Sequence, residues 1–307
     1  MPTPRMMPNK ALSRARTMPT NAKPAVVIRD LETVDDLRKV EAVEKEVWGL
    51  SDQDTMPLTM IIASKEAGSI WVGAFDTDAL VGFAFGFLGR ENGETMIHSH
   101  LLAVRAPYRD LDLGYKLKQA QRERALAMGI RQMTWTFDPL QSKNAHFNFA
   151  KLGVVSEKYK ADFYGLKTSS VLHRNSTDRL WVQWRLSSKR VQQRLQGKDA
   201  SSDSLDALSN LIPLVGFDGD GKPVKTDMET ALGRQRICIE IPSEINAVEQ
   251  KDPALAREWR AATRWAFKES LAAGFFVAEF CRSIRGRQGP GAYLLQKGTV
   301  KEFVPDF

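Results

Sequence analysis

Short apolar runs alternate with amphipathic stretches along the first part of the chain, and their spacing predicts strands and helices. An apolar run predicts a first strand over residues 25–31. Helical spacing follows over residues 33–48, where Thr33 is a suitable N-cap and Gly49 a suitable end. Polar turns separate the next three apolar runs, which favours antiparallel strands. These strands are predicted over residues 69–76, 80–88 and 95–104.

The segments that follow continue the alternation and complete a sheet. A helix is predicted over residues 114–128, because Leu113, Leu117 and Ala120 fall on one face. The further predictions are a strand over residues 133–137, a helix over 144–152 and a strand over 177–186. This order predicts an α/β fold, with a mixed, mostly antiparallel sheet flanked by helices.

The C-terminal part of the chain repeats the strand–helix–strand order of residues 97–137. A strand is predicted over residues 237–241, a helix beginning at Asp252 and Pro253, and a strand over 275–281. The similar spacing predicts a degenerate half-repeat, and its glycine-free connecting loop favours a structural role. The predicted division is a tail over residues 1–24, a first domain over 25–186, a linker over 187–210 and a smaller half-domain over 211–307.

The formal net charge of +7 is concentrated at the N-terminus. Residues 1–24 hold five basic side chains and no acidic one, which leaves about +2 for the rest of the chain. This balance argues against a nucleic-acid partner. The tail lacks periodicity and is interpreted as a disordered extension, with a basic transit peptide as the alternative. No apolar run is long enough for a membrane span, and the two cysteines lack metal-ligand or disulfide spacing, so a cytoplasmic protein is predicted.

The junction between the strand over residues 95–104 and the helix over 114–128 carries the clearest candidate chemistry. Its loop runs from Arg109 to Gly114. A helix that begins there presents unpaired backbone N–H groups and the positive end of its dipole, which together suit a diphosphate. An ordinary strand–helix turn is the alternative interpretation.

This loop, together with the order of elements, resembles the GNAT superfamily of acyl-CoA-dependent N-acyltransferases. The cofactor signature of that superfamily is Arg/Gln-x-x-Gly-x-Gly/Ala. Arg109 matches its first position and Gly114 its last, whereas Asp112 stands at the first glycine. The resemblance implies acetyl-CoA as the acyl donor, with its pantetheine arm along Leu102, Ala103 and Val104. It implies a diphosphate site formed by Arg109, Asp110, Leu111, Asp112, Leu113 and Gly114.

A second segment, from Asn144 to Gly153, resembles the other cofactor motif of the superfamily, Asn-x-x-Ala…Tyr-x-x-x-Gly-Phe. The resemblance implies that Asn144 contacts the pantetheine arm and that Lys151 adds a further cofactor contact. In the family the tyrosine often protonates the departing thiolate. Phe149 stands at that position and has no proton to donate. Another acid, or bulk water, is therefore expected to serve.

Two histidines, His98 and His100, are the candidate general base. They are two residues apart on a predicted strand, so they share one face, and an imidazole titrates near neutral pH. Their spacing before Arg109 resembles that of arylalkylamine N-acetyltransferase, where two strand histidines act as a base through water. The alternative is that hydrogen bonds within the sheet satisfy both rings.

Two further residues are weaker candidates. Asp138, at the end of the strand over residues 133–137, is predicted either to bind a substrate amine or to cap the following turn. Tyr164 is a candidate phenolic acid, with a packing role as the alternative.

These observations predict an N-acetyltransferase that transfers an acetyl group from acetyl-CoA to a primary amine of a small molecule or peptide by direct attack. The alternative is a non-catalytic acyl-CoA-binding or interaction module on the same fold. A nucleic-acid partner bound by the tail is a weaker third interpretation. No membrane association and no metal are expected, and a homodimer is left open.

Overall fold

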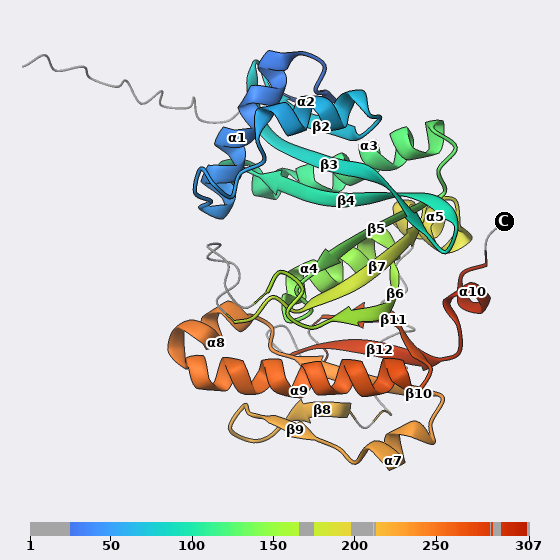
Figure 1. The fold of residues 1–307 in the computed structure, drawn as a ribbon. Coiled ribbons are helices and arrows are strands. Elements are labelled where there is room, and N and C mark those ends of the chain that lie inside the picture. The colour runs from blue at the N-terminus through green and yellow to red at the C-terminus, as the bar shows by residue number, and fades with distance from the viewer. Residues whose placement is uncertain are drawn as a thin grey trace, which may run out of the picture.

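The computed structural model describes residues 25–165, 175–197, 211, 213–282, 284 and 290–305. Within these residues the strands form one 12-stranded sheet in the order β1-β2-β3-β4-β5-β7-β6-β11-β12-β10-β8-β9 (Figure 1). Its strands are β1 (Val26–Asp30), β2 (Ile70–Asp76), β3 (Ala79–Glu91), β4 (Glu94–Val104), β5 (Gln132–Phe137), β6 (Val155–Lys160), β7 (Arg179–Arg185), β8 (Pro213–Phe217), β9 (Pro223–Lys225), β10 (Arg236–Ile241), β11 (Phe275–Cys281) and β12 (Gly291–Lys297).

Helices cover the sheet and connect its strands. The α-helices are α1 (Val34–Trp48), α2 (Leu58–Glu66), α3 (Leu113–Ala127), α4 (Ser142–His146), α5 (Lys189–Leu195), α7 (Met228–Leu232), α8 (Ile245–Lys251), α9 (Pro253–Ala272) and α10 (Val300–Phe303). A 3-10 helix, η1 (Ala106–Leu111), precedes α3, and a wider π-helical segment, η2 (Phe147–Leu152), continues α4. None of the helices in the described ranges is long and apolar enough to cross a membrane.

The predicted mixed α/β fold is confirmed, and so are the local signals that start and stop its first helix. The Thr33 side chain accepts a hydrogen bond from the Asp36 N–H, and Gly49 ends α1 with a left-handed φ of 65°. The helix α2 was not predicted, because the residues of that segment show no clear apolar stripe and Pro57 gives it no side-chain cap.

The strands β2, β3 and β4 form the predicted antiparallel meander. Tight turns connect them, with Thr77 at φ 52° in the first and Asn92 and Gly93 at φ 51° and 86° in the second. The register of β3 and β4 shifts by one residue, since Phe85 pairs with Leu101 but Gly86 pairs with Ser99. His100 is therefore the extra residue of a β-bulge on β4.

The strands β4 and β5 are parallel neighbours over only two residue pairs, Ile97 with Met133 and His98 with Thr134. Beyond these pairs the two strands diverge towards their C-terminal ends, as Figure 1 shows. The bulge at His100 begins at the point where the pairing ends. This divergence is the central feature of the fold for function.

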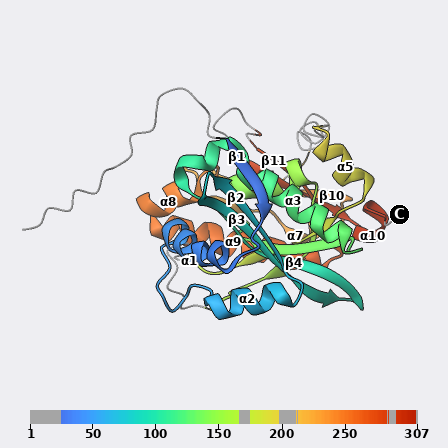
Figure 2. The same cartoon turned by 90° about the horizontal axis from the view of Figure 1, so that it is seen from above.

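The first half of the sheet has a helix layer on each face, as the view from above shows (Figure 2). On one face α3 packs Leu117 and Ala120 against apolar residues of β2, β3 and β4. On the other face α1 and α2 cover Trp71, Phe83 and Phe85. The strand period of two sends alternate β4 residues to these two layers.

The second half of the chain continues the same sheet. β6 and β11 are joined through the pair Ser156 and Val277, and the long helix α9 lies along β6, β8, β10 and β11 (Figure 1). As predicted, Asp252 caps α9, accepting hydrogen bonds from the N–H groups of Ala254 and Leu255.

The C-terminal strand–helix–strand unit differs from its predicted counterpart in strand order. β12 lies between β10 and β11, whereas β4 and β5 are direct neighbours. The helix α5 occupies the first part of the predicted linker. The predicted tail over residues 1–24 and the linker residues 198–210 lie outside the described residues. The division into two domains stays a prediction.

Candidate functional site

The candidate site lies where β4 and β5 diverge, and the bulge gives its two faces different chemistry. His98 and His100 project to the face covered by α1 and α2, with their ring centroids 6.3 Å apart. Ser99, between them, contacts Lys118 and Gln121 of α3 on the opposite face. The predicted sharing of one face by the two histidines is therefore present in the structure.

Aromatic rings surround the histidine pair. Phe87 lies 5.3 Å from His98 and 6.0 Å from His100 between ring centroids, and Trp181 of β7 lies 4.7 Å from His98. Phe163 continues the row at 6.4 Å from Trp181, and Tyr164 packs on Phe163 at 4.8 Å. Tyr164 is thus joined to His98 through two intervening rings and is 40% exposed.

The two histidines have different surroundings. His98 is buried, and its Nδ1 lies 2.9 Å from the hydroxyl oxygen of Thr134. Burial lowers the pKa of His98 to about 4, helped by the charges of His100 and Lys118. His100 is exposed to solvent at the bulge, yet the protein around it displaces enough water to lower its pKa below the ordinary value. At neutral pH both rings are therefore neutral, and His98, with a pKa of about 4, is a weak base.

On the opposite face, the first residues beyond the paired part of β4 and β5 meet one lysine. Lys118 Nζ donates a hydrogen bond to Ser99 Oγ at 2.7 Å and lies 3.7 Å from the centre of the Trp135 ring. Ser99 in turn donates to Gln121 Oε1 at 2.8 Å. Lys118 is only 2% exposed. This lysine was not singled out from the sequence.

The loop before α3 has the form expected of an anion site. Asp112 takes a left-handed φ of 54°, the conformation that favours glycine, and gives α3 no side-chain cap. The first N–H groups of α3 are thus left for another acceptor. Gly114 faces β4, since a Cβ placed on it would meet only Leu102 within 4 Å, at 3.9 Å. The helix N-terminus and the diverging strand therefore border one space.

Charged residues flank this helix N-terminus. The Asp112 carboxylate points outward, with its side chain 74% exposed and Lys151 Nζ 3.8 Å away. Lys151 belongs to η2, so the second predicted cofactor segment approaches the first. Arg109 is exposed and donates a hydrogen bond to the Val104 carbonyl at 3.3 Å. Asn144 lies on the exposed side of α4.

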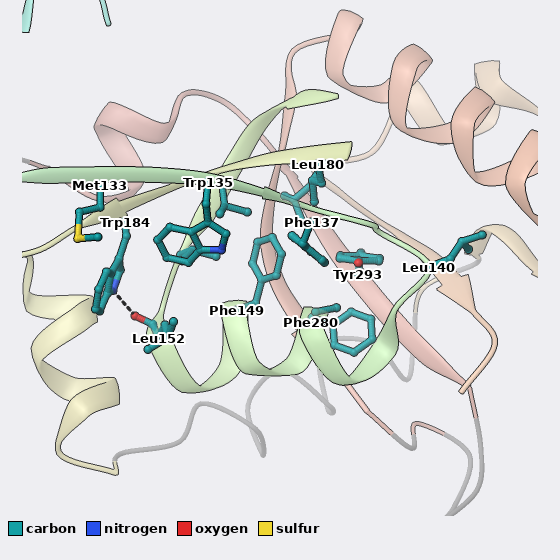
Figure 3. Close-up of a cluster of buried hydrophobic side chains, with 14 of the residues drawn as sticks. Met133, Trp135, Phe137, Leu140, Phe149, Leu152, Leu180, Trp184, Phe280 and Tyr293 are labelled. Carbon is teal, nitrogen blue, oxygen red and sulfur yellow. Dashed lines mark hydrogen bonds between the residues drawn. The ribbon is translucent and has the colours of Figure 1, made fainter. Parts of the chain in front are cut away.

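Phe149 is a core residue in the structure. It is 0% exposed and packs edge-on against Phe137 and Tyr293, as Figure 3 shows beneath β5. The neighbouring Asn148 is also buried and accepts a hydrogen bond from Trp135 Nε1. The position that resembles the family's tyrosine thus supplies packing and no acid.

Asp138 is engaged in the structure and is not available to an amine. Its two carboxylate oxygens accept a bidentate pair of hydrogen bonds from Arg260 of α9 at 2.7 and 2.9 Å. One of them also accepts from the Leu140 N–H at 2.9 Å. The predicted amine-binding role is therefore replaced by an ionic link between α9 and the end of β5. Asp138 therefore holds the turn at Leu140, whereas the predicted cap at Ser142 to Asn144 is absent, since α4 has no side-chain cap.

The sequence interpretation missed Lys118, Ser99 and the ring of Trp181. Lys118 stands next to Leu117 in a helix whose charged residues are expected to face solvent, so the signal was weak. Trp181 lies in a tryptophan-rich strand segment, which indicates packing first. In the described part of the chain no group of three or more His, Cys, Asp or Glu side chains is placed to hold a metal ion.

A sheet that opens between two parallel strands, beside the uncapped N-terminus of a helix, has the form of an acyl-CoA-dependent acetyltransferase. Residues 32–154 match the family model described as the acetyltransferase (GNAT) family. The predicted resemblance to the GNAT superfamily is thereby confirmed over this part of the chain.

Many solved structures are similar to about half of the chain. The ribosomal-protein-S18-alanine N-acetyltransferase of Escherichia coli is 14% identical and aligns over 53% of this chain and 94% of its own, with a TM-score of 0.42. An N-acetyltransferase of Staphylococcus aureus Mu50 is 16% identical over 53% and 99%, with a TM-score of 0.44. No curated protein sequence matches the chain.

Proposed function

We propose that this protein transfers an acetyl group from acetyl-CoA to a primary amine of a small molecule or peptide. The observation that carries the proposal is the coincidence of three features: the end of β4–β5 pairing, the bulge that exposes His100, and the uncapped start of α3. Acetyl-CoA supplies the activated acyl group. The chain's own residues bind it, orient the amine and move a proton.

The residues at the mouth of the opening fit a CoA molecule. The free N–H groups at the start of α3 suit its diphosphate, with Arg109 and Lys151 as nearby cations. Asp112 does not obstruct this role, because its carboxylate points into solvent. Residues 102–104 of β4 lie beyond the last pair with β5, so this edge of β4 has no strand partner and can bind the pantetheine arm. The Val104 carbonyl already accepts a hydrogen bond from Arg109 Nε.

His100 is the proposed general base. It is neutral at pH 7 and reached by solvent, so it can accept a proton from an ammonium or amine through water. The amine nitrogen then attacks the thioester carbonyl directly, and the sheet opening holds the two reactants together. His98, neutral and held against Thr134, supports the His100 side of the site.

The rings around the histidines favour an amine with an apolar or aromatic carbon skeleton. The side chains of Phe87 and Phe163 are large and apolar, yet they are 37% and 39% exposed to solvent. Both lie at the edge of the site, near Trp181. Exposed rings next to a reactive group supply stacking and cation–π contacts to such a substrate. Cys238 and Cys281 are buried and form no disulfide among the described residues, which supports a cytoplasmic location in the proposal.

The test combines binding with turnover. Calorimetry should show stoichiometric acetyl-CoA binding, and a panel of aromatic, aliphatic and peptide amines should release free thiol. The substitution His100→Ala should reduce kcat by about 10²-fold or more while leaving acetyl-CoA affinity within about twofold. Added imidazole should restore part of the lost rate. No binding at millimolar acetyl-CoA would refute the proposal.

The second candidate is a non-catalytic acyl-CoA-binding module, which the burial of Phe149 favours. This candidate predicts acetyl-CoA binding without thiol release for any amine. In that case His100→Ala would leave the protein's behaviour unchanged. The same two measurements therefore separate an enzyme from a binding module.

A further inference from the structure

Lys118 is a buried cation located where β4 and β5 separate. The last residue pair of the two strands is His98 with Thr134, and the next residue on each strand is Ser99 and Trp135. Lys118 Nζ contacts both of these next residues, at 2.7 Å from Ser99 Oγ and 3.7 Å from the Trp135 ring centre. The ammonium group thus lies at the apex of the opening, on the face opposite the histidines.

The surroundings of Lys118 include no acidic partner. Among the described residues no ion pair involves it, and its contacts are a hydroxyl and an indole face. Burial lowers the pKa of Lys118 to about 7. α3 packs on β2, β3 and β4, and His98 on β4 is the titratable group whose charge is coupled to that of Lys118. A buried lysine without a carboxylate is costly, which indicates a use for its proton.

The hydrogen-bonded series that begins at Lys118 ends in an N–H donor that has no acceptor among the described residues. Lys118 donates to Ser99 and Ser99 donates to Gln121, whose Nε2 is buried with no acceptor among the described residues. Gln121 is 0% exposed. A buried amide N–H without a partner is unfavourable in a finished core. The α3 face of the opening therefore presents hydrogen-bond donors in excess of acceptors.

We propose that Lys118 is the general acid of the reaction and protonates the sulfur that leaves the acetyl group. The proposal rests on the proposed function, since it needs acetyl-CoA in the opening with its thioester at the apex. Five residue steps along β4 separate Ser99 from Val104, about 17 Å of strand. This length suits an extended pantetheine arm that begins at the start of α3.

The proton transfers balance across the two faces of the sheet. On the histidine face, the C–N bond forms and His100 takes the proton of the amine. On the α3 face, the C–S bond breaks with its electron pair on sulfur, and Lys118 Nζ gives that sulfur a proton. Lys118 then regains a proton from solvent as the products leave. Lys118 thereby replaces the acid that Phe149 is unable to provide.

The first experiment titrates the thiol of bound CoA, using the ultraviolet absorbance of the thiolate. The thiolate and the Lys118 ammonium stabilise each other's charge, so Lys118 keeps its proton to higher pH beside the thiolate, and the bound thiol should titrate about one unit or more below free CoA. Lys118→Met should remove this lowering. Lys116→Met removes an exposed lysine from the same helix and is the matched control, which should titrate like the unaltered protein.

The second experiment measures kcat against pH. The unaltered enzyme should lose activity above about pH 7, as Lys118 loses its proton, and Lys118→Met should lack this decline and turn over about 10²-fold more slowly. Lys118→Arg keeps a charge that does not titrate, so it should also lack the decline. Circular dichroism and CoA affinity show whether each variant is folded.

The outcomes separate this proposal from the proposed function. An unaltered protein that binds CoA without lowering the pKa of its thiol would overturn the role of Lys118 while leaving acetyl transfer intact. A retained decline above pH 7 in Lys118→Met would do the same. Failure of the unaltered protein to bind any CoA would overturn both proposals. This measurement requires no variant.

Discussion

Removing the carboxylate of Asp138 should destabilise the whole chain, because Asp138 holds a buried cation. Arg260 is 5% exposed and forms its bidentate pair with Asp138 at 2.7 and 2.9 Å. In Asp138→Ala the guanidinium stays buried and loses its only acidic partner among the described contacts. Breaking such a pair costs about 3–5 kcal/mol of the free energy of unfolding. The Leu140 N–H also loses its acceptor, so the upper part of this range is expected.

The assay is urea unfolding at neutral pH, followed by tryptophan fluorescence and circular dichroism. We expect both probes to report one transition in the unaltered protein, since the sheet runs unbroken from β1 to β9 across the described residues. Asp138→Ala should lower the midpoint of that transition. The double variant Asp138→Leu with Arg260→Met should recover much of the loss, because no unpaired charge then remains in the core.

A second ion pair between the two halves of the chain provides the control. Lys143 and Glu244 are 2.8 Å apart, but their side chains are 68% and 52% exposed. Glu244→Ala should therefore cost less than about 1 kcal/mol. If Asp138→Ala costs no more than Glu244→Ala, the argument from burial is wrong. Two separate transitions in the unaltered protein would show instead that the halves unfold independently.

Two further predictions concern single buried residues. Burial raises the pKa of Glu44 from 4.5 to about 7. The protonated Glu44 side chain therefore contributes fully to the free energy of unfolding below pH 4.5, and this contribution is lost as the pH rises through 7. The loss is about 3 kcal/mol. Glu44→Gln should flatten the dependence of the unfolding free energy on pH between about pH 5 and 8, and an unchanged slope would contradict this assignment. Phe149→Tyr should lose about 1–3 kcal/mol of stability and gain no activity, because the new hydroxyl enters the fully buried cluster of Figure 3. Chemical denaturation and thiol release measure the two effects, and a faster enzyme would show that this position still serves as the acid.

Much of the first half of the fold follows from local sequence signals. Thr33, Gly49 and Asp252 mark helix ends through hydrogen bonds within a few residues, and such signals are visible in any sequence. The turn before α3 could also be predicted from the sequence, since the strand, the loop and the helix follow one another along the chain. In contrast, β12 and its position between β10 and β11 depend on pairing between distant segments. No local pattern specifies that pairing.

The site divides in the same way. The shared face of His98 and His100 follows from the period of a strand, whereas the bulge that exposes His100 depends on how β3 and β4 are aligned. Asp138 was interpreted as a ligand or a cap because Arg260 lies 122 residues further along the chain. Ion pairs of that separation are a property of the fold, and a sequence pattern does not reveal them.

Phe149 and Lys118 connect these observations. If the position in η2 has no acid to give, a proton for the leaving sulfur has to come from another element that reaches the apex of the opening. α3 packs on β4, and one turn after Gly114 it presents Lys118 to Ser99 and Trp135, the first residues beyond the β4–β5 pairing. Under the two proposals the faces of β4 carry opposite tasks: the histidine face removes a proton from the amine and the α3 face supplies one to sulfur. The two faces are represented by consecutive residues of β4, His98 and Ser99.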